Sequence, residues 1–404
     1  MTAFSVLKHK TFTLFVIARF LATIALQIQG VAVGWQIYQQ TGSTLNLGLI
    51  GLAQFLPFAL LILIAGYVAD QRNRSGIVLT CFFIELIGGG LLLFFAQRGG
   101  GTVWPIIGVM VLFGIARAFM MPASQAILMD LVPRDYLAQA VALNSSLFHI
   151  AVICAPPVGG FLYLWGATTV YTVVAGLLGF AVVLMLPVRL RTKTVINKRE
   201  PISWHGVLEG LRFVFSKQTV LGALSLDLLA VLFGGVTALL PAYATDILHI
   251  DSLGLGFLRG APALGAALTG IVLGFVPISR RVGAWMFTGV FIFGFSTVLF
   301  GLSTNFYLSL TALFFVGIGD MVSVYIRHIL VQLETPDAIR GRVSAVNSVF
   351  IGASNELGEF ESGISAAFLG LVPAVVMGGC LTLAVTFICL FTFPVLRKMD
   401  RFDV

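Results

Sequence analysis

The chain has 404 residues, of which 58% are hydrophobic and only 10% are charged, against about 25% charged residues in a soluble domain. Its formal net charge is +7 at pH 7, and its mean hydropathy is +1.02. This composition excludes a soluble globular domain and indicates a protein that crosses a membrane many times.

Apolar segments long enough to cross a membrane recur along the whole chain. Each has about 20 residues or more, which is the length that a helix needs to cross a hydrocarbon core of ~30 Å. The sequence therefore predicts an all-α membrane protein with twelve transmembrane helices. They are expected at residues 11–38, 47–69, 76–96, 103–129, 137–163, 167–187, 219–247, 254–277, 282–302, 306–331, 343–370 and 373–396.

The two halves of the chain are similar to each other. With a shift of 203 residues, segment 132–160 aligns with segment 335–363, and the matches include Asn144 with Asn347 and the final glycines of both segments. A membrane protein made of two like halves is the expected build of a secondary transporter, whose substrate site lies between the halves near the bilayer midplane. We therefore expect two pseudo-symmetric six-helix bundles.

The one sizeable polar stretch lies between the halves, at about residues 188–218. Its second part places Val214 and Phe215 on an apolar stripe, which is typical of an amphipathic helix along the cytoplasmic interface. A binding site for a soluble regulator is the alternative interpretation. The expected parts are an N-terminal bundle, a cytoplasmic linker with this helix, and a C-terminal bundle, at residues 1–190, 191–218 and 219–404.

Positive charges gather on one side of the predicted spans. With the N-terminus inside, 19 of the 24 Lys and Arg residues fall in cytoplasmic segments, four arginines fall within spans, and only Arg98 lies in an external loop. Because cytoplasmic loops carry the excess of Lys and Arg, both termini are expected in the cytoplasm. We expect the bacterial cytoplasmic (inner) membrane as the location, with a basic face attracted to anionic lipid and no nucleic-acid partner.

The loop after the second span reads GYVADQRNR, from Gly66 to Arg74. It resembles the signature of loop 2–3 in the major facilitator superfamily. Gly66 permits close approach of helices, and Asp70 can cap the following helix. The resemblance implies an ionic inner gate that forms in one conformation only, and a static stabilising contact is the alternative. The expected gating residues are Gly66, Asp70, Arg72, Arg74 and Asp130.

The fifth span contains the sequence APPVGG, which is similar to the glycine and proline motif of superfamily exporters. Prolines remove backbone donors and bend a helix, and glycines permit close packing. The resemblance implies an exporter, whereas a plain packing kink is the other interpretation. The residues of this helix-bend motif are Pro156, Pro157, Gly159 and Gly160.

Further segments resemble the branch of the superfamily that contains the enterobactin exporter and macrolide-type efflux proteins. They include LHIDSLGLGFLRGAPALGAALTG at 248–270 and ETPDAIRGRVSAVNSVF at 334–350. The resemblance implies the major facilitator fold and export of a small siderophore-like or drug-like compound. One departure is the sequence GASNELGEFESG at 352–363, which places three acids in the eleventh span.

Charged residues inside membrane spans are costly and are therefore functional candidates. The repeat aligns Arg19 with Asp227 and Arg117 with Asp320, so that cations of one half match acids of the other. Arginines can hold an anionic substrate by paired hydrogen bonds. Alternatively, these residues form interhelix ion pairs, with Asp320 joined to Arg327 on the same helix. The expected substrate-binding residues are Arg19, Gln29, Arg117, Asp227, Asp320 and Arg327.

Four buried glutamates are expected to serve proton coupling. Glu356 and Glu359 are three residues apart and share one helix face, whereas Glu361 points away from them. Several nearby acids cannot all remain ionised cheaply in an apolar span, so one of them is expected to load and release a proton. Glu85 in the third span is the fourth candidate.

Three classes of function compete. The first is a proton-coupled exporter of a small organic compound that works by alternating access. The second is a proton-coupled importer of a siderophore or another small molecule. The third, a membrane-embedded enzyme or sensor, lacks support because the chain has no GxxxxGK[ST], HExxH or GxSxG motif. We expect no enzymatic activity, no cofactor, no metal and a monomer that works with protons in the lipid bilayer.

Overall fold

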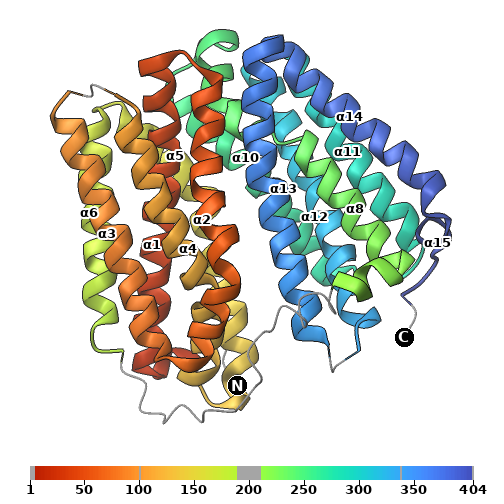
Figure 1. The fold of residues 1–404 in the computed structure, drawn as a ribbon, viewed down its shortest axis with the longest axis horizontal. Helices are drawn as coiled ribbons and strands as arrows, with labels where there is room; N and C mark the ends of the chain where they lie inside the picture. Colours follow the sequence, from red (N-terminus) through yellow and green to blue (C-terminus); the bar gives the residue numbers. More distant parts are fainter. Residues whose placement is uncertain (1–4, 100–101, 189–210, 337–338, 403–404) are drawn as a thin grey trace. The chain divides into compact units, whose positions relative to one another are not determined.

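The computed structural model describes residues 5–99, 102–188, 211–336 and 339–402, and every regular element in these ranges is a helix (Figure 1). The first half follows the predicted spans closely. After the short helix η1 (Ser5–Lys8), its long helices are α1 (Lys10–Thr41), α2 (Thr44–Gln71), α3 (Arg74–Gln97), α4 (Trp104–Leu131), α5 (Leu137–Tyr163) and α6 (Ala167–Met185), with η2 (Arg134–Tyr136) before α5.

The second half has the same sequence of long helices, with one interruption. Its elements are α8 (Gln218–Phe233), η3 (Val236–Leu239), α9 (Leu240–Ala242), η4 (Tyr243–Ile247), α10 (Ser252–Phe275), α11 (Val282–Leu302), α12 (Phe306–Glu334), α13 (Arg340–Leu369), α14 (Leu371–Thr392) and α15 (Pro394–Lys398). The seventh predicted span is thus not one regular α-helix. It breaks at Gly234 and Gly235, where a methyl group on Gly235 would lie 3.0 Å from the backbone of Gly358 in α13.

Asparagine and glycine set several helix boundaries. The side-chain oxygen of Asn305 accepts hydrogen bonds from Tyr307 N at 2.9 Å and Leu308 N at 3.2 Å, so α12 begins with its first donors satisfied. Gly370 separates α13 from α14 with a φ of 90°, a conformation that favours glycine. Gly370 therefore ends α13 and precedes the first residue of α14.

The chain divides into two compact units. Unit 1 comprises residues 1–40, 53–201 and 251–256, and unit 2 comprises residues 41–52, 202–250 and 257–404. Helix α2 therefore begins in unit 2 and continues in unit 1, whereas α10 begins in unit 1 and continues in unit 2.

Eleven helical segments among the described residues are long and apolar enough to cross a membrane. They match eleven of the predicted spans. The remaining predicted span, 343–370, coincides with α13, which is 30 residues long but carries Glu356, Glu359 and Glu361. Helix α13 is the most polar of the long helices because of these acids and its serines.

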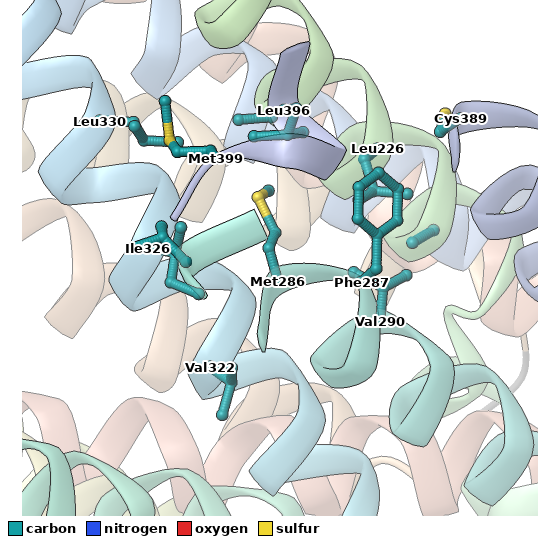
Figure 2. Close-up of a cluster of buried hydrophobic side chains, with 13 residues drawn as sticks. Leu226, Met286, Phe287, Val290, Val322, Ile326, Leu330, Cys389, Leu396 and Met399 are labelled. Carbon is teal, nitrogen blue, oxygen red and sulfur yellow. The ribbon is translucent and has the colours of Figure 1, made fainter. Parts of the chain in front are cut away.

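A buried apolar cluster holds the helices of unit 2 together. Figure 2 shows Leu226 of α8, Met286 of α11, Ile326 of α12, Cys389 of α14 and Leu396 of α15 converging on it. Because lipid tails are as apolar as these side chains, close packing rather than removal from water stabilises such a cluster inside a membrane. The cluster includes Ala223, Leu226, Ala230, Val282, Met286, Phe287, Val290, Val322, Ile326, Leu330, Cys389, Leu396 and Met399.

The end of the chain caps helix α11. The backbone N–H of Gly283 donates to Met399 O at 3.0 Å, and that of Val282 donates to Asp400 O at 3.3 Å. Arg281 N donates to the Asp400 carboxylate at 3.2 Å. The first N–H groups of a helix lack partners within the helix, so this segment satisfies donors that would otherwise need water.

The predicted linker lies mostly outside the described residues. Its last part, residues 211–216, is helical, and Val214 is fully buried against Val220 and Leu224 of α8. Phe215, predicted on the same apolar stripe, is 60% exposed. The apolar face of these residues therefore serves partly to pack against unit 2.

Candidate functional site

The predicted gating residues lie near the turn between α2 and α3 and at the end of α4. Arg74 Nη1 lies 2.7 Å from Asp130 Oδ2 of α4, and Arg74 Nε donates to Ala69 O at 3.3 Å. The guanidinium thus joins the beginning of α3, the end of α2 and the end of α4. The side chains of this pair are 20% and 28% exposed, so water partly screens their attraction.

The expectation that Asp70 caps the helix after this turn is wrong. Helix α2 continues to Gln71, and Asn73 is the cap, since its side-chain oxygen accepts from Ser75 N at 3.0 Å. The side chain of Asp70 lies outside the described part of the structure, so its place in the gate stays a prediction. Arg72 is exposed, and Gly66 is half-buried.

A buried charge cluster joins α8 and α12 in unit 2. Arg327 Nη1 lies 3.1 Å from Asp227 Oδ2, and both side chains are 5% exposed. Ser323 Oγ donates to the other carboxylate oxygen of Asp227 at 3.0 Å. Asp320 interacts electrostatically with both members of the pair. The ion pair therefore links two helices, rather than Asp320 and Arg327 of one helix.

A second charge group joins α10 and α13 in the same unit. Arg259 interacts electrostatically with Glu359. A methyl group on Gly51, in the first turns of α2, would lie 2.9 Å from Glu359 Oε2, so this carboxylate lies directly against α2. Glu356, one helical turn earlier, is buried. Arg259 was not among the expected site residues, although a charge within the apolar run 254–277 is a signal of the same kind as those that were.

Two buried polar residues of unit 1 lie apart from these groups in the chain. Glu85 of α3 is 3% exposed, and Gln29 of α1 is 4% exposed. Neither Glu85 Oε2 nor Gln29 Oε1 accepts a hydrogen bond from the residues that the structure describes. A buried acceptor without a donor costs free energy, so each is a functional candidate rather than a stabilising feature.

The arginines predicted to bind substrate are less buried than expected. Arg19 is half-buried, and Arg117 is exposed, with its guanidinium carbon 5.3 Å from the ring centre of Phe58. A cation over an aromatic face contributes about 0.5–1 kcal/mol at such a site. Both arginines belong to unit 1, whereas Asp227 and Asp320 belong to unit 2.

The helix-bend motif of α5 is a packing surface within unit 1. Helix α5 continues through Pro156 and Pro157. A methyl group on Gly159 would lie 3.0 Å from Ile28 of α1, and Ser252 Oγ donates to Gly160 O at 2.8 Å. The motif therefore brings α1 and the first turn of α10 close to α5.

The remaining predicted acid has a local partner. Ser365 Oγ donates to Glu361 Oε1 at 2.6 Å, one turn along α13. Among the described residues, no three His, Cys, Asp or Glu side chains gather in a way that could hold a metal ion. The arrangement thus offers ion pairs and buried carboxylates, which can bind ions and protons.

Comparison with known proteins gives relatives over nearly the whole length. The chain is 28% identical over 377 residues to the enterobactin exporter EntS of Shigella boydii, covering 90% of this chain and 85% of that protein. It is equally similar to EntS of Escherichia coli, with the same coverage.

Solved structures share the fold at low sequence identity. A bacterial homologue of the human lysosomal transporter Spinster matches with a TM-score of 0.75 and 17% identity, covering 97% of this chain and 99% of that one. The nucleoside transporter NupG matches with a TM-score of 0.73 and 13% identity, covering 96% and 99%. A bacterial homologue of the iron transporter ferroportin matches with a TM-score of 0.70 and 15% identity, covering 96% and 99%.

The family described as transmembrane secretion effector matches residues 1–404, which is the whole chain. This match agrees with the relatives, the eleven candidate spans and the transporter folds of the solved structures. The chain therefore belongs to the transmembrane secretion effector family of the major facilitator superfamily, and it is a multi-pass membrane transporter.

Proposed function

We propose that this protein exports a small organic compound by alternating access and that a proton gradient drives the export. The direction of transport, out of the cell, is inferred from the similarity to enterobactin exporters over 90% of the chain, within a family described as secretion effectors. The compound is siderophore-like or drug-like. Twelve spans arranged as two six-helix bundles would provide the two halves that such a cycle needs.

The substrate is anionic in this proposal. Arg19 and Arg117 would bind it from unit 1, because a guanidinium donates paired hydrogen bonds to carboxylates and similar groups. Gln29 supports the proposal, since its buried side-chain oxygen accepts no hydrogen bond from the described residues and can receive one from a substrate. Asp227, Asp320 and Arg327 were predicted as further substrate contacts, but they form a charge cluster of their own in unit 2.

Buried carboxylates would carry the protons. Glu359 is the first candidate, because its carboxylate faces both Arg259 and α2, and protonation would weaken its hold on the arginine. Glu356 lies one turn away on the same face and is buried, whereas Glu359 is half-buried. Glu85 and Glu361 are the other proposed acids.

The proposed cycle includes an inner gate and a defined orientation. The ion pair of Arg74 with Asp130 would form in one state and break in the other, which makes it a bistable element. The protein would act as a monomer in the bacterial cytoplasmic membrane, with both termini in the cytoplasm. The excess of Lys and Arg in the segments predicted to be cytoplasmic supports this orientation.

The test is a comparison of the small molecules secreted by cells with and without the gene, under iron limitation and under sufficiency. We expect at least one compound to fall in the medium and to accumulate inside the cells that lack the gene. The opposite change, with more compound outside and less inside, would mean import. The compound found in this way can then be used in vesicles with an imposed pH gradient.

A matched pair of variants tests the substrate-binding part. Arg117 and Arg98 both lie over a phenylalanine ring, but Arg98 is outside the predicted spans. We expect Arg117→Gln to weaken binding of an anionic compound by about 1.5–3 kcal/mol, or roughly tenfold to a hundredfold. Arg98→Gln should bind it as the natural protein does. Equal affinities in both variants would remove Arg117 from the binding site.

A further inference from the structure

The ion pair of Asp227 and Arg327 has a fixed arrangement of hydrogen bonds. One carboxylate oxygen of Asp227 faces Arg327 Nη1 at 3.1 Å, and the other accepts from Ser323 Oγ at 3.0 Å. Both carboxylate oxygens of Asp227 therefore have a donor in the structure. In this arrangement the single positive charge of Arg327 is matched by Asp227.

A second acid interacts with the same arginine. Asp320, Ser323 and Arg327 follow one another at spacings of three and four residues, so they lie on one face of α12. Asp320 interacts electrostatically with Asp227 and with Arg327. Two carboxylates therefore interact with one guanidinium, although only Asp227 forms the ion pair, and with both ionised the cluster has an excess negative charge inside a membrane span.

Arg327 has one N–H group, at Nε, that donates no hydrogen bond to the described residues. The residue is 4% exposed, and its Nε is buried. A guanidinium has five N–H donors in a fixed plane, so it can serve two carboxylates at once. An ionised Asp320 that moved toward Nε would use this donor.

The helices packed against α12 carry few other charged residues. Asp227 is the one titratable residue of α8, α11 has none, and Arg259 is the one charged residue of α10. Helix α13 has Arg340 and Arg342 in its first turn and the acids Glu356, Glu359 and Glu361 further along, and Glu359 interacts with Arg259. Among α8, α10 and α11, which pack against α12, the one cation is Arg259, and it interacts with Glu359.

We propose that Asp320 is a proton-binding carboxyl of the transport cycle and that Arg327 is shared between Asp227 and Asp320 according to the proton. With the proton on Asp320, Arg327 pairs with Asp227, as in the structure. When the O–H bond of Asp320 breaks, the proton leaves to water, and the carboxylate accepts a hydrogen bond from Arg327 Nε. This inference rests on the proposed proton-driven transport and moves Asp320 from the substrate side to the proton side.

Infrared spectroscopy of the purified full-length protein in phospholipid vesicles tests this directly, without any substrate. The carbonyl stretch of a protonated carboxyl group is the readout, recorded as difference spectra between variants near neutral pH. We expect Asp320→Asn to remove one such band and Asp135→Asn, which changes an exposed aspartate outside the spans, to leave the spectrum unchanged. Helical content by circular dichroism identifies any variant that fails to fold.

Two further variants test the sharing of the arginine. Asp227→Asn frees Arg327 for Asp320, so the band should become weaker as Asp320 ionises. Arg327→Gln leaves both acids without a cation, so the band area should increase, up to about twofold for two neutral carboxyl groups. A wild-type spectrum in Asp320→Asn, or an unchanged band in both other variants, would overturn the proposal.

The results for Asp320 and the results for proton-driven export can be told apart. If the bands behave as expected but a pH gradient does not drive export of the compound found in the secretion comparison, then proton coupling fails and Asp320 is a protonated structural residue. If the gradient drives export and Asp320→Asn retains both the band and full gradient-driven export, then coupling stands and this assignment is wrong.

Discussion

At the scale of single residues, charge contacts differ in what they contribute. The pair of Arg74 and Asp130 is partly exposed, so its contribution to stability is about 0–1 kcal/mol. The pair of Arg327 and Asp227 is buried, and removing one partner leaves an uncompensated charge at a cost of about 3–5 kcal/mol. The first pair can therefore open and close during a cycle, whereas the second must exchange its partner rather than lose it.

This difference predicts the behaviour of Asp130→Asn. We expect the variant to fold with a melting temperature close to that of the natural protein, but to transport more slowly, because a gate state has lost its ion pair. The measurement is the transport rate beside thermal unfolding, with Asp135→Asn, an exposed acid in the next turn, as control. Normal rates in Asp130→Asn, Arg74→Gln and the double variant would exclude a gating role.

At the scale of helices, glycines set the spacing of unit 2. A methyl group on Gly317 of α12 would overlap the carbonyl oxygen of Pro262 in α10, and one on Gly289 would lie 2.9 Å from Gly319 O. Backbone atoms cannot move aside as the end of a side chain can. Close backbone approach of this kind is a main source of helix association in membranes. This packing also fixes the rotation of α12, and the rotation determines which of its residues, including Arg327 of the charge cluster, face α8.

A pair of substitutions tests this packing. Gly317→Ala should destabilise the protein by about 1–3 kcal/mol, because the added methyl group meets a backbone oxygen. Gly274→Ala, at the end of α10, has nothing within 4 Å of the new methyl group and should change stability little. Thermal unfolding in detergent measures both. Equal melting temperatures would show that α12 and α10 separate more easily than their contact indicates.

At the scale of the whole molecule, the orientation in the membrane decides which side each site serves. Single cysteines at Arg98 and Asp251, in a chain without its four natural cysteines, should react with an impermeant thiol reagent added outside intact cells. Cysteines at Asn73 and Asp135 should react only after the cells are opened. The expectation follows from the distribution of Lys and Arg. The reverse labelling pattern would place the termini outside and make the proposed inner gate an outer one.

The sequence by itself determined the class of this protein. Apolar runs of membrane length predicted helices at the observed places, since hydropathy and length are local properties that each span carries on its own. The loop from Gly66 to Arg74 and the resemblance of further segments indicated the superfamily, which the family match confirmed. The contact of Arg74 with Asp130 also followed from that resemblance.

Only the tertiary structure decided which charges meet. A pair of Asp320 with Arg327 along one helix was one of two interpretations of the sequence, yet the ion pair of Arg327 is with Asp227, a hundred positions earlier in the chain. Arg259 gained a role only when α10 brought it near Glu359. The physical reason is that each helix can rotate about its axis without changing its hydropathy. The packing of neighbouring helices fixes that rotation, and the rotation determines which polar groups face one another.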